Sequence, residues 1–430
     1  MAVTSLVWLK NDLRLHDNEV IFKAVQLSDF VIPVYCIDPR VINGQQYGIP
    51  KMGIFRKRFL KETLLSFCHD LAKLGSQCIV RVGSPESILP QILQEVKAQH
   101  LFTSIELAPE ELLVQQVVLD AIEGLEVTFH GIDTASLFKQ EHLPFTSQQA
   151  PEVFTEFRKR VEKHCAMPAL IPTPDRIPFP NRSIASDDWL QSLETPGISM
   201  EPRSAFPFKG GEQAALQRMN DYILESRNIQ NYKQTRNQLI GTEYSSKFSA
   251  WLANGSLSAR RIYHSIRQYE NTYGGNESTY WLFFELLWRD FFRCMFRKYP
   301  LSFFQARGIE KRITHAMTTN PRAFQHWCQG VTGHDFIDAN MRELNATGFM
   351  SNRGRQVVAS YLCHDLQVDW RWGARYFEQQ LIDYDVCSNW CNWAYVAGVG
   401  NDPRPDRYFN PNNQAEVYDT LSTYRQLWLR

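Results

Sequence analysis

Short hydrophobic runs alternate with amphipathic segments over the first 130 residues of the chain. Runs rich in β-branched residues predict five strands, at 3–9, 31–37, 78–82, 101–107 and 125–130. Apolar residues recurring every three or four positions predict helices near 17–27, 52–74, 85–99 and 110–122. Because strands and helices alternate at the spacing of crossover units, we expect a mostly parallel sheet with helices on both faces.

The pattern becomes helical beyond residue 210. Helical spacing of apolar residues predicts further helices at 211–229, 258–269, 278–298, 322–328, 337–345, 353–365 and 372–382. Residues 165–210 hold eight of the 21 prolines, which fix φ and remove a backbone donor, so we expect an extended linker there. The predicted fold is α/β plus all-α, with an α/β domain at 1–132, a linker at 133–210 and a helical domain at 211–430.

Composition and cysteine usage describe an ordinary soluble protein, with 44% hydrophobic and 21% charged residues. No apolar run reaches the roughly 18 residues that span a bilayer, and we read the first hydrophobic run as a strand and not as a signal peptide. The nine cysteines are scattered without a Cys-x-x-Cys or Cys/His ligand pattern. They predict free thiols, no metal site and a cytoplasmic location.

The net charge of zero hides an imbalance between the two halves. Residues 201–430 carry five more basic than acidic side chains, and residues 1–200 carry five fewer. A polyanion can therefore be a partner of the second half only, although a chance imbalance over solvated faces is an alternative. The dinucleotide fingerprint G-x-G-x-x-G is absent after the first strand, where the loop at 10–18 reads KNDLRLHDN, so a nicotinamide site is not expected there.

Charged and aromatic residues are concentrated at 345–409. The stretch combines arginines and aspartates with four tryptophans, Trp370, Trp372, Trp390 and Trp393. Charges desolvated among such rings persist only when they are paired or bonded to a ligand. Arg355 and Asp383 are one possible pair, which leaves Asp385 and Asn389 to face a heteroaromatic ring. A buried ion-pair network in a helical core is the alternative.

Two further stretches combine polar groups with a predicted helix. Residues 245–249 read SSKFS and place hydroxyls, a cation and backbone N–H groups ahead of a helix, which suits a pyrophosphate, or equally a serine-rich turn with an N-cap. Residues 278–293 form an aromatic helix in which Glu285 and Arg289 stand among apolar neighbours. Its rings are explained by core packing, so only these two charges need a function.

Four long motifs resemble the photolyase/cryptochrome family, and within it the cryptochrome-DASH branch. They are LVWLKNDLRLHDNE (6–19), YSSKFSAWLANGSLS (244–258), FMSNRGRQ (349–356) and DYDVCSNWCNWAYVAGVGNDPRPDRYF (383–409). The resemblance covers nearly the whole chain and implies a Rossmann-like antenna domain joined to a helical domain that binds FAD. It also implies a methenyltetrahydrofolate antenna held by Glu111 of LAPEEL (107–112), which is otherwise explained as a helix-start carboxylate.

The resemblance assigns further roles position by position. The residues similar to those that grip the FAD phosphates and ribityl chain are Tyr232, Ser245, Ser246, Lys247, Phe248 and Ser249. Those similar to the residues lining the flavin and adenine are Arg289, Asn352, Arg355, Asp383, Asp385 and Asn389. In the substrate pocket, Glu285 resembles the carboxyl that bonds a pyrimidine dimer and Trp288 the ring that stacks on it.

The same resemblance implies the activity. We expect blue-light-driven, FAD-dependent repair of cyclobutane pyrimidine dimers by a monomer; a non-repairing photoreceptor that binds FAD and nucleic acid is the alternative. Polar residues at two pocket positions, Gln356 and Tyr395, weaken the hold on flipped bases and favour single-stranded DNA. The candidates for DNA backbone contacts, which are otherwise ordinary solvated arginines, are Arg353, Arg404 and Arg407.

Tryptophans that re-reduce the flavin form the last predicted set. Trp393 and Trp370 resemble the proximal and middle members of the family's electron-transfer chain. The outer member is missing, because the corresponding segment at 312–321 reads RITHAMTTNP. Trp372, Trp390 and Trp327 are unranked candidates for its replacement, and core packing is the alternative role of all these rings.

Overall fold

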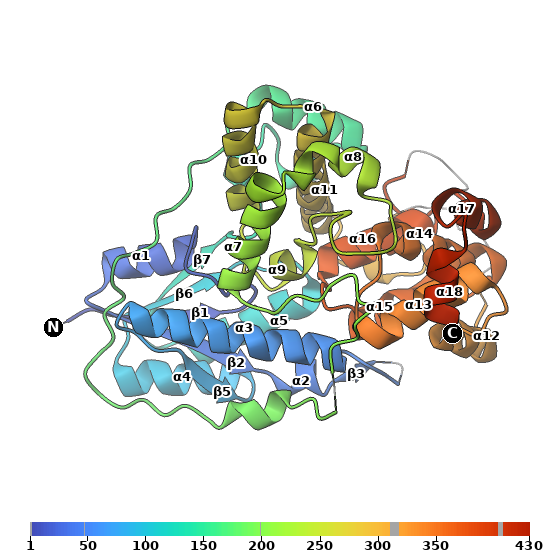
Figure 1. Cartoon of the computed structure of the whole chain (residues 1–430). Coiled ribbons are helices and arrows are strands. Elements are labelled where there is room, and N and C mark those ends of the chain that lie inside the picture. Colours follow the sequence, from blue (N-terminus) through green and yellow to red (C-terminus); the bar gives the residue numbers. More distant parts are fainter. Residues whose placement is uncertain (1, 47, 198, 310–317, 403–406) are drawn as a thin grey trace.

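A five-stranded parallel sheet forms the centre of the first domain in the computed structural model (Figure 1), which describes residues 2–46, 48–197, 199–309, 318–402 and 407–430. The strands lie in the order β5-β2-β1-β6-β7 and are β1 (Thr4–Leu9), β2 (Phe30–Ile37), β5 (Ile79–Val82), β6 (His100–Ser104) and β7 (Thr128–Ile132). In the register, Leu6 of β1 pairs with Ile32 on one side and Leu101 on the other. The expected parallel sheet is confirmed. Two further strands of two residues each, β3 (Gln45–Gln46) and β4 (Ile49–Pro50), pair antiparallel to each other outside this sheet.

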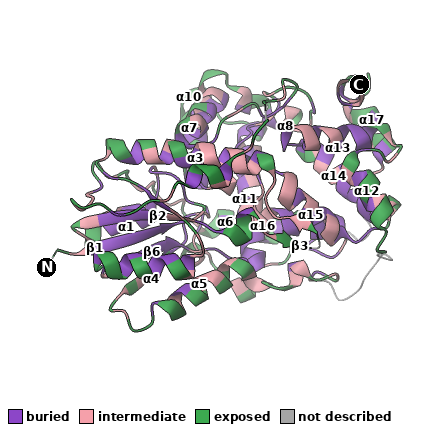
Figure 2. Cartoon of the chain, turned by 90° about the horizontal axis from the view of Figure 1, so that it is seen from below, coloured by how far each residue is buried: buried purple, intermediate pink, exposed green. Residues whose placement is uncertain are grey.

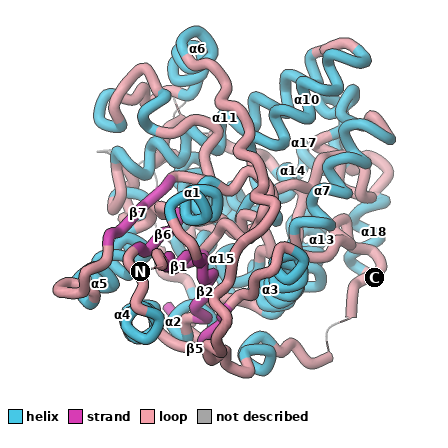
Figure 3. The backbone as a smooth tube through the Cα atoms, turned by 90° about the vertical axis from the view of Figure 1, so that its left-hand side faces the viewer, coloured by secondary structure: helices cyan, strands magenta, loops and turns pink. Residues whose placement is uncertain are grey.

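Helices cover both faces of this sheet, and the alternation of side chains along β1 explains why (Figures 2 and 3). Val7 and Leu9 are buried with α1 (Glu19–Leu27) and α3 (Ile54–Lys73). Leu6 and Trp8 point to the other face and are buried with α4 (Pro85–Val96) and α5 (Pro109–Ala121). Successive residues of a strand face opposite ways, so a strand that is apolar throughout needs cover on both sides. The short α2 spans Pro39–Ile42.

The second domain is helical. Its helices are α7 (Glu212–Asn220), α8 (Tyr232–Thr235), α9 (Ser249–Ala253), α10 (Ala259–Tyr273), α11 (Glu277–Lys298), α12 (Pro321–Gln329), α13 (Asp335–Thr347), α14 (Asn352–Ser360), α15 (Trp370–Gln380), α16 (Val386–Val396), α17 (Pro411–Tyr418) and α18 (Thr423–Leu429). Two of them, α7 and α14, continue into single π-helical turns. The sequence pattern did not predict α16, which carries much of the site below. Among the described residues, no helix is long and apolar enough to cross a membrane.

The segment between the domains is only partly extended. It contains a helix that the sequence pattern did not predict, α6 (Phe154–His164), which packs on α11 through an edge-to-face contact of Phe157 with Phe291, 5.4 Å between ring centroids. Further along, the segment runs beside the sheet domain, where the Ile177 N–H bonds the Leu74 carbonyl at 2.9 Å. The prolines therefore mark the extended stretch beyond α6, and the divisions at 132/133 and 210/211 stay an interpretation.

The loop after β1 clamps the two domains together. Arg14 is buried and donates to the carbonyls of Gly255 (2.9 Å) and Thr134 (2.8 Å). Asp17 pairs with Arg260 at 3.0 Å, with both side chains almost fully buried. Gly255 has φ +75°, and a Cβ there would lie 2.0 Å from the Asn11 carbonyl oxygen, so only glycine permits this approach. The charged loop is thus explained by domain contact.

Candidate functional site

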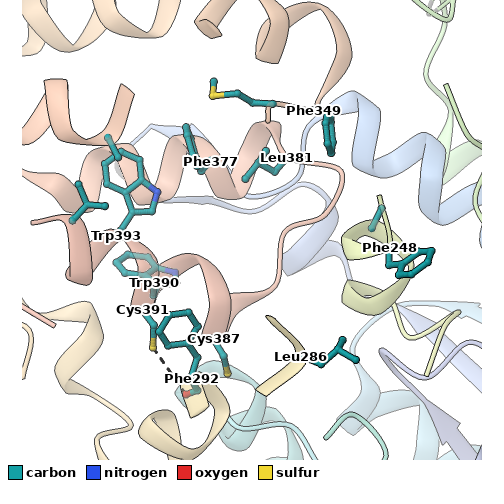
Figure 4. Packing of buried hydrophobic residues seen from close by; sticks show 14 of the residues in the cluster. Phe248, Leu286, Phe292, Phe349, Phe377, Leu381, Cys387, Trp390, Cys391 and Trp393 are labelled. Atoms are coloured by element: carbon teal, nitrogen blue, oxygen red, sulfur yellow. Dashed lines mark hydrogen bonds between the residues drawn. The ribbon is translucent and has the colours of Figure 1, made fainter. Parts of the chain in front are cut away.

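One pocket in the helical domain gathers a part of the predicted site residues. It holds about 660 Å³ of empty space, part of it open to solvent, between α14, α15, α16 and the loop that precedes α16. Its lining includes eight residues named from the sequence, which are Asn352, Arg355, Gln356, Asp383, Asp385, Asn389, Trp393 and Tyr395. The apolar part of the lining includes Phe377 and Leu381, which Figure 4 shows on α15 and just beyond it. Polar and apolar walls of this kind are typical of a site for a heteroaromatic ligand.

Arg355 and Asp383 form the expected ion pair. The Arg355 Nη2 donates to Asp383 Oδ2 at 2.9 Å, and its Nε donates to the Met350 carbonyl at 2.9 Å. Asp383 is 7% exposed, and its second oxygen, Oδ1, is buried without a hydrogen-bond partner among the described residues. A buried carboxylate oxygen without a partner is costly, so this atom indicates that a donor from a ligand belongs beside it.

Asp385 starts α16 and fixes its position at the pocket. Its Oδ1 accepts the Ser388 N–H at 2.7 Å as a side-chain N-cap. Burial acts to raise the pKa of Asp385, but the charges of Arg289 and Arg293 and the hydrogen bonds from Ser388 together hold the pKa below its ordinary value. Asn389, one turn further along, donates from Nδ2 to the Ala374 carbonyl at 2.9 Å, which ties α16 to α15.

Arg289 is placed beside the pocket and not in its lining. Its guanidinium bonds the carbonyls of Ala135 and Leu252, so it ties α11 to the segment after β7 and to α9. From there its charge acts on Asp385. Its contact with the ligand itself stays a prediction.

The SSKFS segment is held by a buried arginine. Arg218 donates to the carbonyls of Ser246 (3.2 Å), Ser245 (3.1 Å) and Thr242 (3.1 Å). Because these carbonyls all accept hydrogen bonds from Arg218, its guanidinium holds the turn in one conformation. Phe248 and Ser249 begin α9, and the buried Tyr232 begins α8.

Lys247 is the most unusual group of this segment. It is 3% exposed at φ 65°, lies 3.2 Å from the Tyr244 ring centroid and 4.9 Å from that of Phe349, and its Nζ has no hydrogen-bond partner in the described part of the chain. Burial lowers the pKa of Lys247 well below its ordinary value, although Glu343 counteracts part of this. An unpaired buried ammonium favours an anionic ligand group at this position.

Glu285 lies on α11 in a polar cluster. Its Oε1 accepts hydrogen bonds from Arg236 Nη1 at 2.5 Å and from Trp281 Nε1 at 3.2 Å. About a third of the side chain reaches solvent (32%), yet the protein around it raises the pKa of Glu285 by desolvation, against the attraction of Arg236. The carboxyl is therefore reachable and is held in one orientation.

Trp288, one turn further along α11, is packed on one side. Phe154 of α6 stacks on it at 3.8 Å and 13° between ring planes, and Tyr395 meets it edge to face at 6.2 Å. Tyr395 belongs to the pocket lining, so this contact joins the α11 residues to the pocket. The indole also contacts Phe291 and Phe292 and is partly exposed.

The three predicted backbone-contact arginines differ in their surroundings. Arg353 donates to Gln414 Oε1 at 3.3 Å and to Asn237 Oδ1 at 3.4 Å. Arg407 pairs with Asp402 and lies over the Tyr395 ring at 4.6 Å. Arg404 lies outside the described residues. Arg407 thus contacts a residue of the pocket lining, and Arg353 follows the lining residue Asn352 in the chain.

Trp370 and Trp393 are both buried, at 0% and 2% exposed. Trp370 starts α15 and donates from Nε1 to the Ala306 carbonyl at 3.2 Å. Trp393 lies on α16 and lines the pocket, as Figure 4 shows beside Phe377. The segment at 312–321 lies largely outside the described residues.

Glu111 occupies the first turn of α5, where the sequence reading also allowed a helix-start role. Its Oε2 accepts the Ala108 N–H at 3.2 Å, so the helix-start role is present. Burial, followed by the charge of Glu106, raises the pKa of Glu111 to about 8. A carboxyl that is neutral at pH 7 can donate a hydrogen bond to a ligand as well as accept one.

Two residues of the site were not found from the sequence. Arg218 and Arg236 lie in ordinary-looking helical and loop stretches, and each becomes significant only through its partners, the SSKFS carbonyls and Glu285. The spacing YKQTR (232–236) puts Tyr232 and Arg236 one helical turn apart, and this was the available signal for Arg236.

The residues present fit FAD. Asp383 Oδ1 and Gln356 Oε1 are buried acceptors without partners among the described residues, and Lys247 Nζ is a buried donor without one. A flavin ring supplies an N–H donor for Asp383 Oδ1, and a phosphate supplies an anion for Lys247 Nζ, whereas Gln356 Oε1 remains for a second ligand. Fold and pocket together define a two-domain flavoprotein of the photolyase type.

Comparisons with known proteins agree with this class. The family described as "FAD binding domain of DNA photolyase" matches residues 281–430, and "DNA photolyase" matches residues 5–178. The Cryptochrome DASH of Synechocystis sp. is 43% identical over 428 residues, which cover 99% of this chain and 87% of the relative. That of Xenopus laevis is 43% identical over 429 residues, covering 98% and 81%.

Solved structures give the same result. The chain is similar to a Synechocystis sp. cryptochrome (TM-score 0.95, 42% identity, covering 100% of this chain and 89% of the other). It is also similar to a bacterial class III photolyase from Agrobacterium tumefaciens (TM-score 0.87, 26% identity, covering 100% and 87%). The chain belongs to the photolyase/cryptochrome family, in its cryptochrome-DASH branch.

Proposed function

We propose that this protein repairs cyclobutane pyrimidine dimers in single-stranded DNA, using blue light and FAD. The observation that carries the proposal is a contact between the residues of α11 and the residues that line the pocket. Trp288 of α11 meets Tyr395 of the pocket lining, so the carboxyl of Glu285 and the flavin pocket belong to one connected site. When bound, reduced FAD supplies a light-driven electron that opens both cyclobutane bonds and is then returned, so that no net oxidation occurs.

Four residues hold the cofactor in this proposal. Asp383 accepts a hydrogen bond from the flavin edge through Oδ1, with Arg355 fixing the carboxylate from the other side. Asn389 presents a neutral amide near the ring, and Lys247 neutralises phosphate charge. Glu111 is the proposed contact of a folate antenna, which its raised pKa permits because a neutral carboxyl can donate.

The substrate residues orient the extruded dimer. Glu285 bonds a pyrimidine through its second oxygen, Oε2, while Arg236 and Trp281 keep Oε1 in place. Trp288 stacks on the pyrimidines with the part of its indole that its ring neighbours leave exposed. Arg353 and Arg407 attract the DNA backbone.

A preference for single strands follows from the polar lining. Gln356 and Tyr395 line the pocket, and a buried Gln356 Oε1 favours polar contacts over apolar packing against flipped bases. Extruding two bases from a duplex costs a few kcal/mol, which is largely saved when the strand is already unpaired. Weak apolar contact leaves less binding energy to offset that cost.

The test is light-dependent repair of one thymine dimer in a single-stranded oligonucleotide, beside the same dimer in a duplex and a dark control. We expect turnover of the single strand in the light and slower turnover of the duplex. Gln356→Met, which replaces the amide by an apolar side chain of similar length, should lower the ratio of single-strand turnover to duplex turnover. No turnover by a preparation with bound, reducible flavin would reject repair and assign the protein as a non-repairing photoreceptor.

A further inference from the structure

A second cavity lies among α6, α10 and α11, three helices that lie together in Figure 1. It holds about 600 Å³ of empty space, part of it open to solvent, and shares no lining residue with the flavin pocket. Its lining includes aromatic and polar side chains, among them Glu162, Cys165, Tyr263, Arg267, Tyr280 and Phe283. The proposed function uses none of these residues, so the cavity needs an explanation of its own.

Three aromatic rings of this lining contact one another. Tyr263 of α10 meets Phe283 of α11 edge to face at 5.2 Å between ring centroids, and Tyr280 meets Phe283 at 6.3 Å. Core packing explains Phe283, which is buried, but Tyr263 and Tyr280 are only partly buried. Aromatic side chains of this kind stack with any nucleobase, because every base has a π face.

Glu162 and Arg267 supply an acceptor and a donor to the same cavity. Glu162 Oε1 accepts from the Tyr280 hydroxyl at 2.6 Å, while Oε2 makes no hydrogen bond with the described residues. Arg267 Nε donates to the Tyr263 hydroxyl at 3.0 Å, while Nη2 makes none in the described part of the chain. The pairing edge of a nucleobase carries both donors and acceptors, and proteins bond it when the base is unpaired.

The outer surface of α6 beside the cavity is basic. This helix carries four basic and two acidic side chains, and Lys159, Arg160 and Lys163 are exposed. Basic side chains that follow a backbone, together with rings on which bases stack, are the two features of a site for single-stranded nucleic acid. An uncharged small ligand would account for the cavity but not for these cations.

Ring contacts join this cavity to the proposed substrate residues of α11. Tyr280 meets Phe284 at 6.3 Å, and the Arg158 guanidinium lies over the Phe284 ring at 5.7 Å. Phe284 in turn meets Phe154 at 5.0 Å, and Phe154 stacks on Trp288 at 3.8 Å. Tyr280 and Trp288 lie on one helix, about 12 Å apart along its axis at 1.5 Å per residue. A stacked strand at roughly 3.4 Å per nucleotide spans that distance with at most about four nucleotides.

We propose that this cavity binds an unpaired base of the DNA strand that carries the dimer, within about four nucleotides of the dimer on one side. The inference rests on the proposed function, because the bound dimer fixes that distance. The base stacks on Tyr263 and Tyr280, and its pairing edge bonds Glu162 Oε2 and Arg267. A paired base hides that edge, so the cavity increases affinity for single strands only. A free nucleotide carries the same groups, and the experiment distinguishes the two sources.

The experiment measures the Kd of the FAD-loaded protein in the dark for oligonucleotides that carry one thymine dimer and unpaired flanks of increasing length, on the 5′ or the 3′ side. Deoxycytidine monophosphate is the free nucleotide. Tyr263→Leu removes a stacking ring, and Tyr273→Leu is its control, a tyrosine of the same helix that is 46% exposed and does not line the cavity. Arg267→Gln and Arg261→Gln form a second matched pair on α10.

Cys165 gives a readout inside the cavity. Its thiol belongs to the lining and is partly exposed. Burial raises the pKa of Cys165, so iodoacetamide is applied at alkaline pH, where the thiolate forms. Peptide mass spectrometry compares its alkylation with that of Cys68, which is also partly exposed but does not line the cavity. An oligonucleotide with a long flank should protect Cys165 and leave Cys68 reactive.

We expect the Kd to fall in one step, by about 5- to 150-fold, at the flank length at which a base first reaches the cavity. Tyr263→Leu and Arg267→Gln should remove most of this step, whereas Tyr273→Leu and Arg261→Gln should keep it. The step should also be absent when the flank is paired with a complementary strand. If Tyr263→Leu does not fold, Arg267→Gln still decides the matter, because 46% of the Arg267 side chain is exposed.

A smooth rise of affinity with flank length, equal in Tyr263→Leu and Tyr273→Leu, would overturn the base site. Protection of Cys165 by deoxycytidine monophosphate at concentrations near the Kd of the long oligonucleotide would overturn the strand and assign the cavity to a free nucleotide. A protein that repairs no dimers but shows the step and the protection would contradict the proposed function and support the base site. Light-driven repair without the step would do the opposite.

Discussion

Asp383→Ala separates the structural role of the Arg355 pair from its role toward the flavin. The substitution removes a charge-assisted bond of 2.9 Å, a kind that contributes about 1.5–3 kcal/mol. Arg355 keeps its bond to Met350, and 24% of its side chain remains exposed. We therefore expect a loss of about 2 kcal/mol in the free energy of unfolding, below the roughly 3–5 kcal/mol of a fully buried broken pair.

The loss of flavin affinity comes in addition. If Asp383 Oδ1 accepts a hydrogen bond from the flavin, that bond contributes about another 1.5–3 kcal/mol, which corresponds to roughly 10- to 150-fold in Kd. Fluorescence of FAD released on serial dilution measures this change. Thermal unfolding without added FAD measures the loss of stability.

Asp419→Ala is a control in which an ion pair of the same length and similar exposure is removed away from the pocket. Asp419 pairs with Arg425 at 2.9 Å, with side chains 3% and 25% exposed, against 2% and 24% for Asp383 and Arg355. Asp419 does not line the pocket. Because Asp419 also accepts the N–H groups of Tyr424 (2.8 Å) and Arg425 (3.1 Å), the Asp419→Ala variant should lose more stability than Asp383→Ala and keep the wild-type Kd for FAD. Equal Kd values for the Asp383→Ala variant and the wild type would show that Oδ1 does not face the flavin.

Three further substitutions give distinct outcomes. Glu285→Ala should lower dimer repair per photon while FAD binding is retained, and an unchanged repair yield would reject the assignment of Glu285. Burial raises the pKa of Glu343 to about 7. The folded state therefore prefers the neutral acid. The stability that this preference contributes is complete below the unfolded-state pKa near 4.5 and is lost as the pH rises through 7. Glu343→Gln should remove this pH dependence, so that above pH 7 its free energy of unfolding exceeds that of the wild type by on the order of 3 kcal/mol. Denaturant titrations at several pH values measure this difference, and a difference that does not change with pH would contradict the prediction. Gly373→Ala places a Cβ 2.2 Å from Trp393 Cη2 and 2.6 Å from Leu362 Cδ2. The substitution should therefore lower the free energy of unfolding by about 1–3 kcal/mol and displace Trp393. An unchanged thermal unfolding curve would show that the helices move apart without cost.

The sequence predicted the sheet because short β-branched runs alternate with amphipathic helical segments at the spacing of crossover units. It missed α16, where Asn389 and Asn392 interrupt the apolar spacing, since one side of this helix lines the polar pocket while the other packs into the core. It missed α6 because neighbouring prolines suggested an extended chain. Helices whose faces are shaped by a ligand or by a neighbouring domain lack the periodicity on which such predictions depend.

The candidate site shows the same division. Arg355 and Asp383 were paired correctly, because two opposite charges among aromatic residues must find partners. Arg218 and Arg236 escaped notice because their partners are backbone carbonyls and a carboxylate distant in the sequence. Only the fold brings these groups together, and no local spacing encodes such contacts.

The most direct measurement of the proposed activity is a single-flash experiment on the reduced protein bound to one dimer in a short single strand. Recovery of thymine absorbance after a blue flash, and none in the dark, is the result that the account predicts. No recovery, with the flavin reduced and the DNA bound, would contradict it.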